Sequence, residues 1–263
     1  MDSVHYTPAE RAVVITRVAE LHWHALEDDR VVGRGEASPR PDGRIFLSID
    51  AWHDVVFERL AEAMLPALPR PLYTVVDEED VELTSQWRRA GFATRRREWE
   101  YLVPTDPRTT GLGAVLPPPG VTIVPVGEAD DGLLRELDRV IRDEVEATVG
   151  WQEMPAEVVP RPDGVTVLDP SKYAAAVEAG HYVGYVRLAQ VIRQPRIGLI
   201  AVRDGVRRRG IARALLAEAL GSLHRNGTGT ASAEVNEANG AALALFDRVG
   251  ARRAGSNLEL VVR

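Results

Sequence analysis

Hydrophobic and polar positions in the first part of the chain alternate with the periods of strands and of helices. Alternation bounded by turn residues predicts strands over 22–27, 30–37, 44–50, 72–76 and 93–103. Apolar residues at helical spacing predict helices over 52–65 and 81–90, between the later strands. This succession of strands and helices is typical of an α/β protein.

The later part of the chain continues the same mixture. Strands are predicted over 121–126, 165–168, 181–190, 197–202, 230–236 and 254–262, and helices over 130–145, 211–223 and 240–249. Residues 149–170 are rich in proline and are expected to be irregular. A segment rich in proline and glycine indicates a linker over 106–117, between domains of residues 1–105 and 118–263.

The two parts end alike, which indicates an internal repeat. Trp87, Gly91 and the strand up to 103 recur at one constant offset as Phe246, Gly250 and the strand up to 262. The upstream helical segments RLAEAML and ALLAEAL align as well. The alternative is that two unrelated α/β segments share a common helix–glycine–strand ending.

Residues 199–220, LIAVRDGVRRRGIARALLAEAL, combine a short apolar strand, a basic turn and a helix rich in alanine and leucine. The first N–H groups of a helix have no intrahelical partner and lie at the positive end of its dipole, so this junction suits a phosphate. Gly210 lets the backbone approach a ligand, and Arg207, Arg208, Arg209 and Arg213 add positive charge. A solvated basic turn before a surface helix is the alternative for these residues taken alone.

This turn resembles the acetyl-CoA loop of the GCN5-related N-acetyltransferase (GNAT) family, Arg/Gln-x-x-Gly-x-Gly/Ala. Arg207, Gly210 and Ala212 occupy its defining positions, although Asp204 stands where proline is commoner. A second family pattern, Asn-x-x-Ala-x-x-Leu-Tyr/Phe-x-x-x-Gly-Phe, matches from Asn239 to Gly250 and departs from it only at its last position, Ala251.

The resemblance implies an α/β GNAT fold with a mixed sheet, present as two tandem GNAT-like domains. It covers residues 118–263 well, whereas residues 1–105 resemble a degenerate copy without the cofactor loop. The arrangement is similar to that of mycothiol synthase-like proteins. One acetyl-CoA site per chain, in the second domain, is therefore expected.

The resemblance also implies the residues of that site. The pyrophosphate would lie at the N–H groups of residues 208–213 and the pantetheine beside the strand end, where the N–H of Val202 would polarise the thioester carbonyl. The implied cofactor-binding residues are Ile200, Ala201, Val202, Arg207, Arg208, Arg209, Gly210, Ile211, Ala212, Arg213, Asn236, Asn239, Ala242 and Phe246. Asn239 would also serve as the N-cap of the last helix.

Strand alternation places Glu234 on the same face as Asn236 and makes it the candidate general base, with a solvated or salt-bridged glutamate as the alternative. Phe246 stands where the family often has a tyrosine as general acid, so Tyr182, Tyr185 or a water would have to replace it. The acidic residues Asp143, Glu144, Glu146 and Glu153 are expected mostly on an exposed helix face, and Trp151 is a candidate pocket residue.

These features predict an acetyl-CoA-dependent N-acetyltransferase that transfers an acetyl group directly, in a ternary complex, to a primary amine of a small molecule or peptide. The alternatives are an acyl-CoA-binding sensor or pseudoenzyme without catalysis, and a scaffold of two stacked halves. The identity of the amine stays open.

The composition of the chain excludes or disfavours several other classes of protein function. The net charge of −7 argues against a nucleic-acid partner and favours a cationic acceptor, and the absence of cysteine excludes disulfides and thiolate metal sites. His22 and His24 share a strand face but lack a third ligand, so no metal is expected. No apolar stretch long enough for a membrane span and no leader pattern occur, so a cytoplasmic location without a membrane partner is expected. A homodimer stays open.

Overall fold

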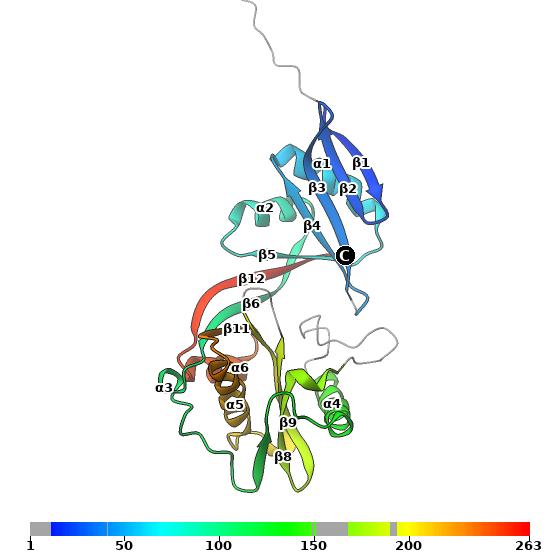
Figure 1. The fold of residues 1–263 in the computed structure, drawn as a ribbon. Coiled ribbons are helices and arrows are strands. Elements are labelled where there is room, and N and C mark those ends of the chain that lie inside the picture. The colour runs from blue at the N-terminus through cyan, green and yellow to red at the C-terminus, as the bar shows by residue number, and fades with distance from the viewer. Residues whose placement is uncertain (1–11, 41, 149, 151–167, 190–193) are drawn as a thin grey trace, which may run out of the picture. The chain divides into compact units, whose positions relative to one another are not determined.

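The computed structural model describes residues 12–40, 42–148, 150, 168–189 and 194–263 (Figure 1). The chain divides into two compact units. Unit 1 comprises Met1–Arg95 and Leu258–Arg263, and unit 2 comprises Arg96–Asn257.

Unit 1 is a sheet packed against two helices. Its strands run in the order β1-β2-β3-β4-β5-β12, with the last residues of β12 at the end of the row. Helix α1 lies along β2, β3 and β4, and its residues Phe57 and Leu60 are fully buried in the core (Figure 1). The elements are β1 (Val14–Ala19), β2 (His22–Glu27), β3 (Arg30–Pro39), β4 (Ile45–Ala51), α1 (Asp54–Met64), η1 (Leu65–Ala67), β5 (Leu72–Asp77) and α2 (Val81–Arg89).

Unit 2 is a sheet covered on both faces. Its strands run in the order β12-β6-β11-β10-β9-β8-β7, and α4 and α5 lie on opposite sides of β8 and β9 (Figure 1). Leu215 and Leu216 of α5 pack on one face of the sheet, and Leu134 and Ile141 of α4 pack on the other. The elements are β6 (Ala93–Pro104), α3 (Pro107–Thr110), β7 (Val121–Val124), α4 (Asp131–Glu146), η4 (Pro170–Lys172), β8 (Tyr173–Glu178), β9 (His181–Ala189), β10 (Arg196–Val202), η5 (Asp204–Val206), α5 (Ile211–Arg225), β11 (Thr230–Asn236), α6 (Gly240–Arg248) and β12 (Arg252–Val262).

The element order β-β-β-α-β-α-β recurs in the two units. The N-cap of the second helix and the glycine that follows this helix recur as well. Asp80 and Asn239 cap α2 and α6 through their side chains, as predicted for Asn239. Gly91 and Gly250 follow those helices with φ of 94° and 72°, a left-handed conformation that glycine adopts without strain. The repeated glycine therefore marks the point where each helix must end and turn into a strand.

Each unit also contains two parallel strands that pair only briefly. Among the described residues, β4 pairs with β5 at Ile45 and Phe46, and β10 pairs with β11 at Arg196 and Ile197. Beyond these positions the described parallel ladders end. The third and fourth strands of each repeat, β4 with β5 and β10 with β11, therefore stop pairing after their first residues.

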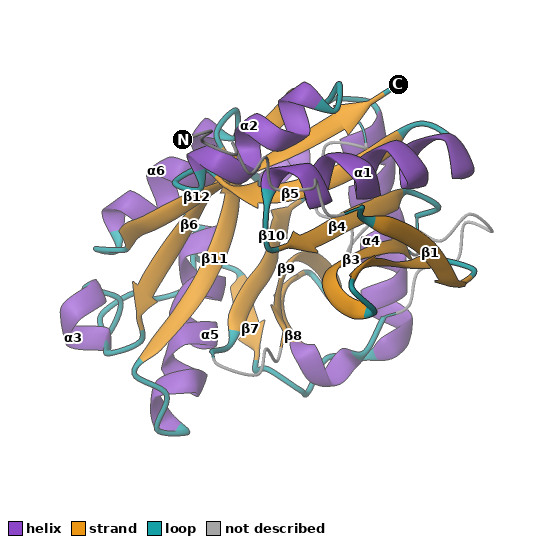
Figure 2. Ribbon diagram, turned by 90° about the horizontal axis from the view of Figure 1, so that it is seen from above, coloured by secondary structure: helices purple, strands orange, loops and turns teal. Residues whose placement is uncertain are grey.

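The closing strand of each repeat enters both units, and for this reason the units differ from the predicted domains. β6 begins in unit 1 and continues in unit 2, where it pairs with β11 from Glu98 to Pro104 (Figure 2). β12 begins in unit 2 and ends in unit 1. The predicted linker 106–117 lies within unit 2, where α3 forms and Leu112 is buried.

Three further differences concern strands. The predicted strand 165–168 falls mostly outside the described residues, and Leu168 is buried without being in a strand. β1 and β8 were not predicted. Residues Ala174–Ala176 of β8 are fully buried, and alanine favours helices when it is judged by propensity alone.

One helix also differs from its prediction. Helix α1 begins two residues later than predicted, at Asp54.

Candidate active site

The turn between β10 and α5 presents the N-terminus of a helix of 15 residues without a side-chain cap. Gly210 stands at the N-cap position with φ of 93°. The helices α4 and α6 of the same unit are capped instead by Asp130 and Asn239, whose side chains accept hydrogen bonds from backbone N–H groups. The first N–H groups of α5 therefore remain available to an anion, at the positive end of the helix dipole.

The four arginines of residues 207–213 are not equivalent. Arg207 donates to the carbonyl oxygen of Val202 at 3.0 Å and forms ion pairs with Asp204 at 2.9 Å and Glu144 at 3.3 Å. These contacts hold the turn against its own strand and against α4, so the charge of Arg207 is already balanced by carboxylates.

Arg209 is balanced in the same way. Its guanidinium group forms two hydrogen bonds to the Glu178 carboxylate, at 2.7 and 3.1 Å, and these bonds hold the pKa of Glu178 below its usual value. Arg208 and Arg213 are exposed and make no ion pair within the described part of the chain. Within residues 207–213, the positive charge left for a ligand therefore comes from Arg208 and Arg213.

Most acidic residues of this region were expected on an exposed helix face, and Asp143 and Glu146 are exposed, whereas Glu144 is half-buried. Its carboxylate accepts the backbone N–H of Asp204 at 2.9 Å as well as the Arg207 guanidinium group. The contact spans 60 residues of sequence, and no local pattern indicates it.

The strand before the turn offers a free backbone edge. Ile200, Ala201 and Val202 pair with β9 on one side, opposite Val186, Tyr185 and Gly184. On the other side the described ladder to β11 has already ended at Ile197. An extended molecule with amide groups can therefore lie along β10 in the manner of an added strand.

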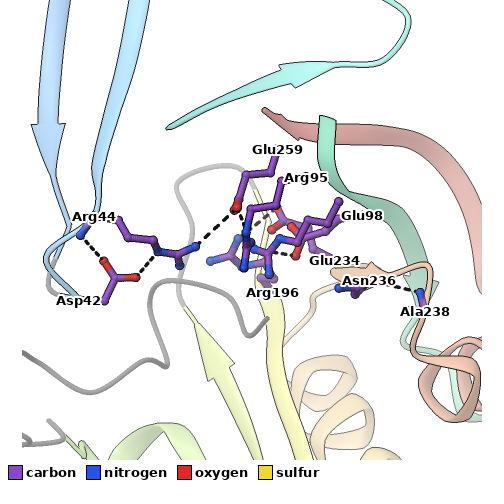
Figure 3. A network of polar contacts seen from close by, with 10 residues as sticks. Asp42, Arg44, Arg95, Glu98, Arg196, Glu234, Asn236, Ala238 and Glu259 are labelled. Atoms are coloured by element: carbon purple, nitrogen blue, oxygen red, sulfur yellow. Dashed lines mark hydrogen bonds and ion pairs between the residues drawn. The ribbon is translucent and has the colours of Figure 1, made fainter. Parts of the chain in front are cut away.

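The residues of the second motif have visible structural roles. Asn236 accepts the N–H of Ala238 at 2.9 Å (Figure 3). Asn239 accepts the N–H of Ala242 at 3.1 Å. Phe246 is buried and stacks on Tyr101, with ring centroids 5.6 Å apart. Ile211 is also buried, whereas Ala212 and Ala242 are half-buried.

Glu234 lies on the face of β11 opposite to α5, because its neighbours Ala233 and Val235 are buried in the core that α5 covers. Its carboxylate forms an ion pair with Arg196 at 3.1 Å (Figure 3). The sequence left a salt-bridged glutamate as the alternative to a general base, and the ion pair with Arg196 is present.

The two tyrosines considered as substitutes for the acid are buried, and both of their hydroxyls already take part in hydrogen bonds. The Tyr182 hydroxyl accepts the N–H of Asp130 at 2.8 Å, next to the first turn of α4. The Tyr185 hydroxyl lies 3.3 Å from Asp138, and burial raises its pKa well above the usual value. A phenol with a raised pKa is a weaker proton donor, so the geometry does not favour Tyr185 as an acid.

Tyr101 of β6 was missed by the sequence analysis. It is fully buried, donates to Asp247 at 3.0 Å, accepts from Arg253 at 2.9 Å, and desolvation raises its pKa. It stands opposite Ala233 in the β6–β11 ladder. Its position depends on which strand joins β11, and no pattern within residues 1–105 indicates that partner.

Other features add no chemistry to the site. Trp151 and Glu153 lie outside the described residues. In the ranges that the structure describes, no three His, Cys, Asp or Glu side chains gather as metal ligands, and no helix is long and apolar enough to cross a bilayer. A hollow of about 300 Å³ lies between Pro107, Leu112 and the α5 residue Leu220, and the residues of the arginine turn do not line it.

Comparison with known proteins agrees with this geometry. Residues 165–259 match the family model of the acetyltransferase (GNAT) domain. A search of curated proteins gave no significant match. The matched segment is therefore similar to the GNAT acetyltransferase domain, whose family is one of acyltransferases.

Several solved structures share the fold of nearly the whole chain. A GCN5-related N-acetyltransferase from Sphaerobacter thermophilus is 18% identical, with a TM-score of 0.64 over 94% of this chain and 82% of that one. A tandem GNAT protein from the clavulanic acid biosynthesis pathway is 15% identical, with a TM-score of 0.65 over 92% and 82%. A GCN5-related N-acetyltransferase from Kribbella flavida is 17% identical, with a TM-score of 0.61 over 95% and 89%. The chain thus has the tandem GNAT fold, as predicted.

Proposed function

We propose that the chain is an acetyl-CoA-dependent N-acetyltransferase that transfers an acetyl group directly to a primary amine of a small molecule or peptide. The observation that carries the proposal is the uncapped N-terminus of α5 at Gly210, next to the unpaired edge of β10, within a GNAT acetyltransferase domain. An anionic group and an extended amide chain fit these two neighbouring features, and acetyl-CoA contains both.

Different residues of the turn and of β10 would bind different parts of acetyl-CoA. The N–H groups of Arg208–Arg213 would hold the pyrophosphate, and the unpaired guanidinium groups of Arg208 and Arg213 would add charge. Arg207 and Arg209 would act indirectly, because their contacts with Glu144 and Glu178 keep the turn in its binding conformation. Backbone groups of Ile200–Val202 would align the pantetheine and polarise the thioester carbonyl.

The first test is binding together with turnover. Acetyl-CoA is expected to raise the melting temperature of the full chain, since a ligand that binds only the folded state stabilises it. Incubation with acetyl-CoA and a panel of primary amines is expected to release free thiol only when an accepted amine is present. Absence of any thermal shift would overturn the proposal.

A sensor or pseudoenzyme is the second candidate, and Phe246 is the observation that favours it. The buried ring of Phe246 cannot donate a proton to a leaving thiolate. Tight binding of acetyl-CoA with no thiol release over the whole panel would support this second function. Thiolates leave without much assistance, however, so the loss of a tyrosine at position 246 does not by itself remove activity.

A further inference from the structure

Unit 1 has a second, smaller core on the face of its sheet opposite to α1 and α2. Phe46 of β4 and Tyr73 of β5 are register partners, and their rings stack with centroids 5.4 Å apart. Their chain neighbours Leu47 and Leu72 are buried in the core beneath the helices, so Phe46 and Tyr73 project to the other face. The two rings form an aromatic surface on that face.

Arg44 lies against this aromatic surface and is largely buried. Its guanidinium carbon is 5.5 Å from the centroid of each ring, and its side chain is only 11% exposed. Nε donates to the Asp42 carboxylate at 2.5 Å, and the backbone N–H of Arg44 donates to the same carboxylate at 3.0 Å (Figure 3). These bonds hold the guanidinium group in place and satisfy Nε.

The two terminal nitrogens of Arg44 lack acceptors. Nη1 and Nη2 are both buried, and neither makes a hydrogen bond with any residue that the structure describes. The Glu259 carboxylate forms an ion pair with Nη1, but 3.6 Å is too long for a hydrogen bond. Buried polar groups are nearly always hydrogen-bonded, and each exception calls for an explanation. Two neighbouring donors of this kind match the two oxygens of a carboxylate.

The charges around Arg44 favour an anion as the missing acceptor. Asp42 and Glu259 are the carboxylates that contact Arg44, and Glu259 also pairs with Arg95. Arg40 adds a third guanidinium group over the aromatic surface and has no carboxylate partner in the described ranges. Three guanidinium groups thus face two carboxylates. A water molecule would leave this excess of positive charge, whereas a ligand with one negative charge would balance it.

We propose that Nη1 and Nη2 of Arg44 bind the carboxylate of a small organic acid beside the aromatic surface of Phe46 and Tyr73. Each carboxylate oxygen would accept a hydrogen bond from one of the two nitrogens, and the apolar part of the acid would contact the rings. Every residue of this site belongs to unit 1, so the proposal does not rest on the acetyltransferase function.

The first test replaces chloride stepwise by acetate at constant ionic strength and follows the melting temperature of the full chain. Acetate is expected to raise the melting temperature to a plateau, because it binds the folded state. Acetamide has the shape of acetate without its charge and is expected to have no effect. An unchanged melting temperature throughout the replacement, or equal effects of acetate and acetamide, would overturn the proposal.

The second test uses Arg44→Lys, which keeps the positive charge but removes the pair of terminal nitrogens. The variant is expected to raise the Kd of acetate by about tenfold, the effect of losing a hydrogen bond between charged groups. Arg34→Lys, at an exposed arginine of β3 in the same sheet, is the matched control and is expected to keep the affinity within about twofold. Equal affinities of Arg44→Lys and wild type would overturn the assignment.

A measurement on the wild-type chain covers the case in which Arg44→Lys does not fold. With 15N-labelled arginine, acetate is expected to shift the Nη signals of the one guanidinium group that contacts the Phe46 and Tyr73 rings. Absence of a saturable shift would overturn the proposal without any variant. Such a failure leaves the proposed acetyltransferase function intact, because binding of acetyl-CoA and acetylation of amines are measured separately.

Discussion

At the scale of single residues, the conformation of the turn before α5 depends on which side chains are absent and which are already paired. Gly210 supplies a positive φ and no cap, so the N–H groups of α5 stay exposed to a ligand. Arg207 and Arg209 are bound by Glu144 and Glu178, whereas Arg208 and Arg213 have no carboxylate partner among the described residues. Two of these four arginines therefore stabilise the turn, and the other two leave positive charge for a ligand.

Replacing Gly210 with glutamate is expected to abolish binding of acetyl-CoA. The new carboxylate would stand at the helix N-terminus and repel the pyrophosphate, and the added side chain would cover the N–H groups. Gly227→Glu is the matched control: Gly227 follows the other end of α5, has φ of 81°, and has open space around its Cβ position. Isothermal titration with acetyl-CoA should show loss of binding only for Gly210→Glu, and equal affinities would refute the placement of the pyrophosphate.

Removing the charge of Arg213 is expected to weaken binding of acetyl-CoA without unfolding the chain. Arg213→Gln should raise the Kd by about 3- to 10-fold at low salt, the effect of losing one exposed charge next to a phosphate, and by less as salt screens the interaction. Arg225→Gln, at the far end of the same helix, serves as the control. A salt-independent effect, or an equal effect in both variants, would contradict the role assigned to Arg213.

At the scale of elements, α4 is attached to the sheet by a buried polar cluster. Arg142 and Tyr185 both contact Asp138, with the Arg142 Nε 2.6 Å from the carboxylate. The ring of Tyr185 also packs edge-to-face against Tyr173. The same helix holds the arginine turn through Glu144, so the position of the turn depends on how α4 sits on β9.

Tyr185→Phe is expected to change how the stability of unit 2 depends on pH. Burial raises the pKa of Tyr185 well above its usual value, so this group contributes stability below the unfolded pKa of about 10 and loses it as the pH rises further. The variant should lose about 1 kcal/mol near neutral pH through its missing hydrogen bond, yet lose less stability than wild type in alkaline solution. Urea unfolding at both pH values measures the difference, and parallel losses would contradict it.

At the scale of the whole molecule, the two repeats share their closing strands. β6 supplies Tyr101 and Val103 to the core of unit 2, and both are fully buried there. Burying two such side chains stabilises the fold by on the order of 4 kcal/mol. The first part of the chain is therefore needed by the domain that carries the cofactor motifs, although its own copy of the loop is missing.

Two fragments that differ only in β6 test this dependence. A fragment of residues 96–257 is expected to unfold cooperatively and to bind acetyl-CoA. A fragment of residues 106–257 lacks the strand that pairs with all of β11, so its unpaired edge should cause aggregation or non-cooperative melting. Thermal unfolding followed by circular dichroism distinguishes the two, and identical melting curves would show that β6 is dispensable.

The features that sequence patterns predicted are those encoded by neighbouring residues. The cap Asn239, the glycine after each repeated helix and the strand–turn–helix unit around Gly210 all lie in short segments with their own turn and cap chemistry, and the structure contains each of them. Segments without such chemistry were missed, as the alanine-rich β8 shows. Its strand conformation comes from neighbours on both sides and from burial on both faces.

The sequence by itself determined the fold class, the tandem repeat of elements and the location of the arginine turn, because periodicity, caps and turn glycines act over a few residues. Only the tertiary structure decided that β6 joins β11, that Tyr101 stacks on Phe246 and that Glu234 forms an ion pair with Arg196. The physical reason is that strand order and register depend on hydrogen bonds and packing between segments more than a hundred residues apart, which no local pattern records.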